Sequence, residues 1–258
     1  MTPLLAGPNL RPVSFSEDEI ERYARHLVLA EVGGPGQQAL KRARVAVVGM
    51  GGVGGPAALY LAAAGLGEMV LIDDDAVALS NLQRQVQFGM DDLGAPKVEA
   101  AKAGLARLNP HVTIEAVQAR LTTDTAKALL ASADVVIDGT DDFATRFAVN
   151  AACVAAGIPL VSGALGRWSG QVGVFAGRPC YHCLVPEVPP EAETCARVGV
   201  VGALAGVVGS MAALEAVKVI TGAGQALTGR MMLYDGLAGT ARTVTVASDP
   251  SCPVCGPP

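Results

Sequence analysis

The sequence is poor in aromatic and charged residues, which make up 4% and 17% of its 258 residues. The formal charges sum to −5 at pH 7, so the chain lacks the basic surface that binding to a nucleic-acid backbone requires. We therefore expect no nucleic-acid partner. Hydrophobic residues account for 51% of the sequence, which is enough for a sizeable core and argues against extensive disorder. The length suits one large α/β domain with small appendages.

The N-terminal segment has no basic stretch and only a short apolar run, so we do not expect a secretory signal. Residues 198–214 are entirely apolar, Gly or Ser, but the run is short and glycine-rich for a membrane span. Glu215 and Lys218 close it on one side. We expect a buried helix there, in the core or at a subunit interface, and a cytoplasmic protein with no membrane partner.

From residue 44 onwards, short apolar runs alternate with helical patterns. The runs at 45–49, 69–73, 112–117, 134–138 and 159–163 are typical of buried parallel strands. This rhythm predicts an α/β fold with a Rossmann-like, doubly wound and mainly parallel sheet, whose ligand binds at the carboxyl ends of the strands. After residue 163 the pattern changes and predicts antiparallel strands that extend the sheet.

We expect residues 1–40 to form an N-terminal helical arm and residues 41–258 to form a single domain. Ser16 and Glu19 match the S-x-x-E pattern of a helix capping box. Apolar residues then recur at helical spacing from Ile20 to Val28, which predicts one helix with an apolar face. The GGPG sequence at 33–36 is expected to end that helix.

The run at 45–49 leads into a glycine-rich turn in which Gly49, Gly51 and Gly54 satisfy G-x-G-x-x-G. Glycine permits positive φ and lets phosphate oxygens approach the backbone, and the following helix directs its N-terminal amides at the anion. Asp73 ends the next strand, where an acid binds a ribose in dinucleotide folds. Capping of a turn is the alternative for Asp73. No G-K-[S/T] follows the glycines, which excludes a P-loop of the Walker type. The glycine turn and Asp73 fit NAD as well as ATP.

The loop after Asp73 offers Asn81 and Arg84, and Lys97 follows at the start of a helix. Cations near a glycine turn suit a triphosphate, although exposure on the surface is the usual position of Lys and Arg. Asp141 and Asp142 follow a buried strand, where a carboxylate suits a magnesium ion that bridges phosphates. Helix capping is the alternative at this position, and Thr140 and Asp141 are well suited to it. The two interpretations can hold for different residues.

Four of the six cysteines form two C-x-x-C pairs, which are Cys180 with Cys183 and Cys252 with Cys255. This is the ligand set of a structural four-cysteine zinc site, with no open coordination position for catalysis. His182 lies inside the first pair and offers a competing ligand, although we expect it to be exposed or to lie outside the ligand set.

The other two cysteines differ from each other. Cys153 lies among Ala and Val in a helix and is expected to be a small buried hydrophobic residue. Cys195 lies in a polar loop beside Arg197, which favours the thiolate. It is either a nucleophile or a bystander.

Several motifs together resemble the ThiF/MoeB/HesA family of adenylyltransferases, the bacterial relatives of ubiquitin-activating enzymes. They are GMGGVGG, LIDDD, LSNLQRQ, GAPKVE around Lys97, DGTDD and the two C-x-x-C pairs, and the similarity runs from about residue 19 to 256. RYARHL at 22–27 is similar to the family's N-terminal arginine segment. The resemblance implies an enzyme that uses MgATP to adenylate the C-terminal glycine carboxylate of a ubiquitin-like sulfur-carrier protein. The sulfur would serve molybdopterin, thiamine or thiolated tRNA synthesis.

The resemblance also implies roles for individual residues. The nucleotide would be bound by Gly49, Gly51, Gly52, Asp73, Ser80, Asn81, Arg84, Lys97, Asp141 and Asp142. The catalytic set would be Arg25, Arg84, Lys97 and Asp141, together with Cys195, which takes part in sulfur transfer in some members only. Asp141 would bind magnesium, and the four paired cysteines would bind zinc. Asp142 departs from the family pattern, which often has Asn there.

The resemblance implies partners as well. Arg25 would reach into the other subunit's site, which implies a homodimer. The chain shows no rhodanese-type segment, so sulfur would come from a separate donor such as a cysteine desulfurase or a rhodanese. The competing hypotheses are an NAD-dependent oxidoreductase, a tRNA-modifying dehydratase of the same superfamily, and a non-enzymatic scaffold.

Overall fold

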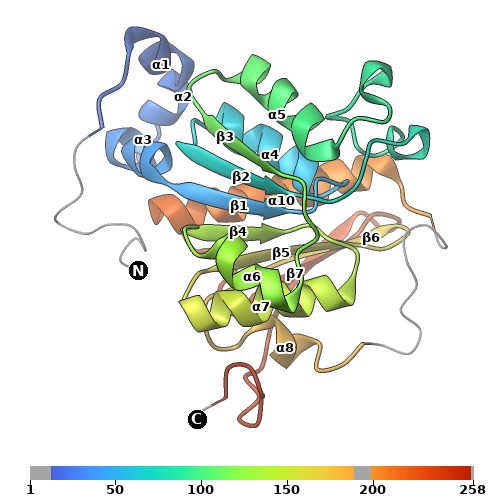
Figure 1. The fold of residues 1–258 in the computed structure, drawn as a ribbon. Helices are drawn as coiled ribbons and strands as arrows, with labels where there is room; N and C mark the ends of the chain where they lie inside the picture. The colour runs from blue at the N-terminus through green and yellow to red at the C-terminus, as the bar shows by residue number, and fades with distance from the viewer. Residues whose placement is uncertain (1–12, 189–198, 257–258) are drawn as a thin grey trace.

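The computed structural model describes residues 13–188 and 199–256, in which one eight-stranded sheet runs through the molecule (Figure 1). The strand order is β3-β2-β1-β4-β5-β6-β7-β8. The strands are β1 (Arg44–Val48), β2 (Glu68–Ile72), β3 (Thr113–Val117), β4 (Val135–Asp138), β5 (Leu160–Leu165), β6 (Ser169–Phe175), β7 (Arg230–Asp235) and β8 (Thr240–Thr245). Strands β1 to β5 pair in parallel, and β6, β7 and β8 extend the sheet with antiparallel pairs. The predicted fold class is confirmed.

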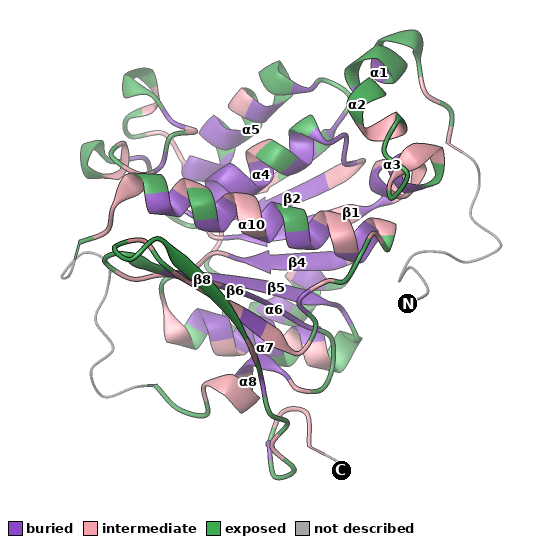
Figure 2. Ribbon diagram, turned by 180° about the vertical axis from the view of Figure 1, so that it is seen from behind, coloured by how far each residue is buried: buried purple, intermediate pink, exposed green. Residues whose placement is uncertain are grey.

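Helices cover both faces of the parallel half of the sheet, so its central strands are buried on both sides (Figure 2). Val45 and Val47 of β1 belong to one hydrophobic cluster, whereas Ala46 and Val48 belong to the other. This explains why the strand has no polar alternation. One face carries α3 (Gly33–Arg42), α4 (Gly54–Ala63), α5 (Lys97–Leu108) and α10 (Gly202–Thr221), and the other carries α6 (Thr123–Leu130) and α7 (Phe143–Ala156). The end of the sheet at β8 is largely exposed.

The N-terminal helix is shorter and more broken than the apolar spacing predicts. The capping box of Ser16 and Glu19 is present, but α1 (Glu17–Arg22) ends at Tyr23 and α2 (Ala24–Leu27) follows it. Tyr23 is buried and its hydroxyl accepts a hydrogen bond of 2.9 Å from Nδ2 of Asn109, whereas Ile20 is 50% and Val28 79% exposed. The expectation of one helix with an apolar face is therefore wrong, because the chain bends to insert Tyr23.

The GGPG sequence begins a helix instead of ending one. Helix α3 starts at Gly33, which has a φ of +54°, and Pro35 lies in its first turn. Proline is tolerated there because the amides of the first turn have no partner within the helix. The expectation that this sequence terminates a helix is wrong, because a proline breaks a helix in its interior and not in its first turn.

Helix α10 contains the apolar run and packs against α4 over the sheet. The approach is close, because a Cβ on Gly209 would lie 2.5 Å from the carbonyl oxygen of Val53. Within the described residues, α10 is the one helix whose length and composition would allow a membrane span. Length and composition do not separate such a span from a core helix, and 56% of the apolar window is buried. The predicted buried helix is confirmed.

One further short helix and two 3-10 turns complete the described elements. The turns are η1 (Leu79–Asn81) and η2 (Met90–Asp92), both in the connection between β2 and α5. Helix α8 (Tyr181–Leu184) follows β6 and carries the first cysteine pair. The chain's C-terminal end returns to α8, which brings the second pair beside the first (Figure 1).

Candidate active site

A cavity of about 480 Å³ opens at the carboxyl ends of β1, β2 and β4. This volume is in the range of small-molecule sites. Strand β1 is flanked by β2 on one side and by β4 on the other, so the order of the strands reverses at this point. Ligands of open α/β sheets bind at such a reversal. The position and size of the cavity make it the candidate active site.

The glycine turn lines the cavity, and its glycines have different structural reasons. Gly49 has a φ of +84°, and a Cβ on Gly54 would lie 1.9 Å from the carbonyl oxygen of Gly49. Backbone conformation and packing therefore account for these two positions. A Cβ on Gly51 would meet nothing closer than Nε2 of Gln85 at 3.7 Å. Packing does not require a glycine at 51, whereas a phosphate approaching the N-terminus of α4 does.

Asp73 ties the end of β2 to the glycine turn. Its Oδ2 accepts a hydrogen bond of 2.6 Å from the amide of Met50, and Oδ1 accepts one of 2.8 Å from the amide of Asp75. Burial raises the pKa of Asp73, and the charge of Lys97 with these two amides offsets part of that effect. A carboxylate accepts about four hydrogen bonds in total, so Asp73 retains lone pairs for ribose hydroxyls. Its capping of the turn and a ribose role are compatible.

The amide and cations predicted from the loop after β2 lie in the same cavity. Asn81, Arg84 and Lys97 all line it. Nη1 of Arg84 donates a 3.0 Å hydrogen bond to the carbonyl of Ser80, and Ser80 itself does not line the cavity. Lys97 is 5% exposed, and its Nζ lies 2.7 Å from Oδ2 of Asp75. The structure thus brings two cations to the turn, as a polyphosphate site requires.

The two acids after β4 have separate surroundings. Asp142 is the N-cap of α7, where it accepts hydrogen bonds from the amides of Ala144 and Thr145 at 3.3 and 3.0 Å. Burial opposes its ionisation, but hydrogen bonds from the side chain and backbone of Thr145 outweigh burial and lower the pKa of Asp142. Asp141 is exposed, lines the cavity and has no hydrogen bond or ion pair with any described residue. Its free carboxylate fits a magnesium ligand.

The capping alternative holds for Asp142, and not for Thr140 or Asp141. Asp142 occupies the N-cap, and the hydroxyl of Thr140 donates to Oδ1 of Asp138 at 2.7 Å. The sequence leaves a choice of three adjacent polar residues, and the helix start at Phe143 decides it.

Two arginines in the cavity are not found by the sequence reasoning. Arg146 is 5% exposed on α7, and its guanidinium donates to Oγ of Ser162 at 3.1 Å and to the carbonyl of Gly163 at 2.8 Å. It also donates to the carbonyl of Thr140 and lies 3.7 Å from Oδ2 of Asp138. An arginine on the buried face of an apolar helix is the available signal. Arg120, in the loop after β3, gives no signal because it belongs to no motif.

Besides Ser80, one described residue of the predicted nucleotide-binding and catalytic set does not line the cavity, and one predicted residue is not described. Arg25 is exposed on α2 and does not line the cavity of its own chain. Its predicted role therefore depends on a second subunit. Cys195 lies outside the described residues.

The four paired cysteines converge away from the cavity. Sγ of Cys180 lies 3.7 Å from Sγ of Cys252, Sγ of Cys183 lies 3.4 Å from Sγ of Cys255, and all four lie within 4.8 Å of one another. A tetrahedral zinc site with Zn–S distances of about 2.3 Å places its sulfurs about 3.8 Å apart. The thiols therefore fit zinc. Cys153 is 2% exposed, and burial with the nearby charge of Asp138 raises its pKa to about 12, as expected for an inert thiol.

Comparisons with known proteins identify relatives of the chain. The model of the ThiF family matches residues 23–254. The chain is 46% identical to the SAMP-activating enzyme E1 of Haloferax volcanii, covering 95% of this chain and 92% of that protein. It is 45% identical to the sulfur carrier protein adenylyltransferase of Thermus thermophilus, with 94% and 93% covered. It is 44% identical to the molybdopterin-synthase adenylyltransferase of Escherichia coli, with 94% and 98% covered.

A solved structure with the same fold is E. coli MccB with ATP. It has a TM-score of 0.79 and 24% identity, and the match covers 91% of this chain and 74% of that one. At this identity the likeness concerns the fold alone.

Proposed function

The chain belongs to the ThiF family, and on that premise we propose that it adenylates the C-terminal glycine carboxylate of a ubiquitin-like sulfur-carrier protein. The relatives that it matches over nearly their whole length are named as adenylyltransferases or activating enzymes of such carriers. The observation that carries the proposal is the convergence of Gly51, Asp73, Arg84, Lys97 and Asp141 on one cavity. The products would be an acyl-adenylate and pyrophosphate.

ATP would supply the adenylyl group, and residues from several elements of the protein would bind the nucleotide. The open Gly51 and the N-terminus of α4 suit the phosphates, and Asp73 suits the ribose. Arg84 and Lys97 would bind phosphate oxygens, and Asp141 would hold a magnesium ion that neutralises part of their charge. Asn81 would add an amide beside these groups, and the capping role of Asp142 would keep the Asp141 loop in place.

The reaction requires that the carrier's carboxylate is positioned against ATP and that the charge of the phosphates is neutralised. An oxygen of the carrier's carboxylate forms a bond to the α-phosphorus, and the bond from that phosphorus to the bridging oxygen breaks. The electron pair leaves with pyrophosphate. The carboxylate is already ionised at neutral pH, so no general base is required. Arg84 and Lys97 hold the phosphates in line and reduce the repulsion between the two anions that react.

The NAD-dependent oxidoreductase hypothesis accounts for the glycine turn and Asp73 but gives no role to Lys97. A lysine that is 5% exposed and directed at the same cavity suits a polyphosphate better than a hydride carrier. The dehydratase hypothesis requires a basic surface for tRNA, and the net charge of this chain is −5. Carrier adenylation is the function that uses most of the cavity's residues.

The remaining parts of the proposal concern assembly. The four thiols would hold a structural zinc ion that ties the end of the chain to α8. Arg25 would act in the site of the partner subunit of a homodimer. A cysteine desulfurase or a rhodanese would supply the sulfur, and the protein would work in the cytoplasm without nucleic acid or a membrane. Molybdopterin, thiamine and thiolated tRNA synthesis are the candidate pathways.

Exchange of labelled pyrophosphate into ATP tests the function. We expect exchange only in the presence of a carrier that ends in Gly-Gly, tested across the organism's carriers. Saturable binding of NAD with no affinity for ATP would overturn the proposal.

A further inference from the structure

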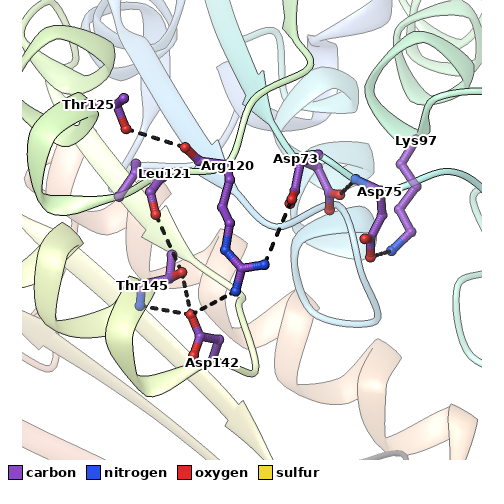
Figure 3. Close-up of polar contacts among 9 residues, drawn as sticks. Asp73, Asp75, Lys97, Arg120, Leu121, Thr125, Asp142 and Thr145 are labelled. Carbon is purple, nitrogen blue, oxygen red and sulfur yellow. Dashed lines mark hydrogen bonds and ion pairs between the residues drawn. The ribbon is translucent and has the colours of Figure 1, made fainter.

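Arg120 lies between two loops at the rim of the cavity. It belongs to the connection from β3 to α6, and its side chain is 63% exposed. Nη1 lies 3.9 Å from Oδ2 of Asp74, and Nη2 lies 3.5 Å from Oδ2 of Asp142. Figure 3 shows the guanidinium between the loop of Asp73 and Asp75 on one side and the start of α7 on the other. One side chain thus links the expected ribose side of the site to the expected magnesium side.

The charges that line the cavity give the position of Arg120 its significance for nucleotide binding. Five carboxylates line the cavity and four cations oppose them. Besides Arg120, two of those cations have acidic partners in the protein, because Lys97 pairs with Asp75 and Arg146 faces Asp138. A nucleoside triphosphate brings further negative charge into this cavity. The cation that pairs with Asp142 therefore affects how much repulsion the phosphates meet.

Asp142 cannot easily be moved away from the site. Its carboxylate accepts hydrogen bonds from two amides at the start of α7 and a 2.6 Å hydrogen bond from Oγ1 of Thr145. All three hydrogen bonds are donated to the carboxylate, so this position holds a negative charge. This fixed charge follows directly after Asp141 in the chain. The exposed carboxylate of Asp141 thus has a permanent negative neighbour, which a metal-bound triphosphate must tolerate.

We propose that Arg120 is a nucleotide-positioning residue, which offsets the charge of Asp142 and holds the two loops together so that MgATP binds. The inference rests on the proposed function, because it takes MgATP as the ligand. It assigns Arg120 no contact with the reacting atoms. The residue acts on affinity for the nucleotide through Asp142 and Asp74.

The test is binding of MgATP to the full chain by calorimetry. Arg120→Gln removes the charge, and we expect the Kd to rise about tenfold, the scale of one partly screened charge interaction. Arg120→Lys keeps the charge and should bind within about threefold of the parent. Arg107→Gln is the matched control, because Arg107 is an exposed arginine outside the cavity. It should bind like the parent.

A double-mutant comparison tests the link to Asp142. Asp142→Asn keeps a side chain that can cap α7 but removes the charge. In that background Arg120→Gln should raise the Kd by less than about threefold, because the charge that it offsets is gone. Arg120→Gln with the parent's Kd would overturn the inference. The inference would also be overturned if Arg120→Gln raised the Kd for MgATP in the Asp142→Asn background by at least as much as in the parent.

Two further readouts keep the outcomes separate. At saturating MgATP, the kcat of Arg120→Gln should stay within about twofold of the parent while KM for MgATP rises, since positioning here acts on ground-state affinity. Thermal unfolding shows whether Arg120→Gln is folded, and Arg120→Lys provides the comparison if it is not. A parent protein that binds MgATP but forms no carrier adenylate would contradict the proposed function, and the binding comparison at Arg120 would still stand.

Discussion

Nζ of Lys97 lies 2.7 Å from Oδ2 of Asp75, and the backbone amide of Lys97 donates a 2.9 Å hydrogen bond to the backbone carbonyl of Asp75. The lysine is thus held at both its backbone and its side chain, and Figure 3 shows the side-chain contact. Lys97 is buried and lines the same cavity as the glycine turn. A phosphate that binds in the cavity would offer this ammonium a second anion. The pair with Asp75 therefore orients the lysine towards the expected ligand.

Removal of the ammonium tests this relationship. We expect Lys97→Ala to lower kcat/KM for pyrophosphate exchange by about a hundredfold or more, the usual effect of losing a preorganised charge in a transition state. Lys97→Arg keeps the charge but not the shape, and should restore only part of the activity. Asp75 is 66% exposed at its side chain, so it can be solvated in the alanine variant and folding should persist. Activity equal to that of the parent would remove Lys97 from the site.

Substitution of Asp141 should affect activity without affecting stability. Its carboxylate has no hydrogen bond or ion pair among the described residues, so Asp141→Ala should leave the melting temperature within about 1 °C of the parent, as for a surface substitution. The same change should abolish exchange, because the expected magnesium ligand is lost. Differential scanning calorimetry and the exchange assay measure the two effects on one sample. A large fall in melting temperature would show that Asp141 has a structural role instead.

Arg25 and Asp141 together test the proposed homodimer. Arg25→Ala and Asp141→Ala should each be inactive alone. When the two variants are mixed and allowed to exchange subunits, about a quarter of the parent's sites should contain both residues, because half of the dimers are mixed and each has one complete site. Recovery of exchange activity on mixing is the expected result. Absence of recovery in dimers shown to have exchanged would argue against an arginine that acts across the interface.

Asp142 makes the stability of α7 depend on pH. As an N-cap it should contribute about 1 kcal/mol, so Asp142→Ala should lower the free energy of unfolding by about that amount at pH 7. Its folded-state pKa is lowered, so this contribution is present above the ordinary Asp pKa of about 3.9 and is lost as pH falls through the lower folded value. Denaturant unfolding from pH 7 to pH 3 should therefore show the difference between parent and Asp142→Ala shrinking at the acid end. A difference that stays constant would contradict the charged cap.

Structural features that are determined by neighbouring residues could be predicted from the sequence, whereas features that depend on distant contacts could not. The buried strand at 45–48 and the glycine turn follow from properties of the residues themselves, so an apolar run and a positive φ are predictable. The break at Tyr23 is not, because it depends on a hydrogen bond to Asn109, far along the chain.

The candidate site divides in the same way. Asp73, Arg84 and Lys97 follow strands or begin helices in a recognisable order, and all three line the cavity. Arg146 and Arg120 reach it only because the fold brings α7 and the β3–α6 loop to the same edge of the sheet. No spacing in the sequence encodes that meeting, so Arg120 is not predictable from it, and the one signal for Arg146 is its place on the buried face of an apolar helix.

The central claim is that this cavity transfers AMP to the end of a carrier protein. The most direct measurement is mass spectrometry of a Gly-Gly carrier incubated with the protein and MgATP, beside the same carrier without its last glycine. We predict that the intact carrier gains the mass of one AMP and that pyrophosphate is released with it, whereas the truncated carrier is unchanged. Arg84→Ala should give no product. An intact carrier that stays unmodified while the protein binds MgATP would contradict the claim.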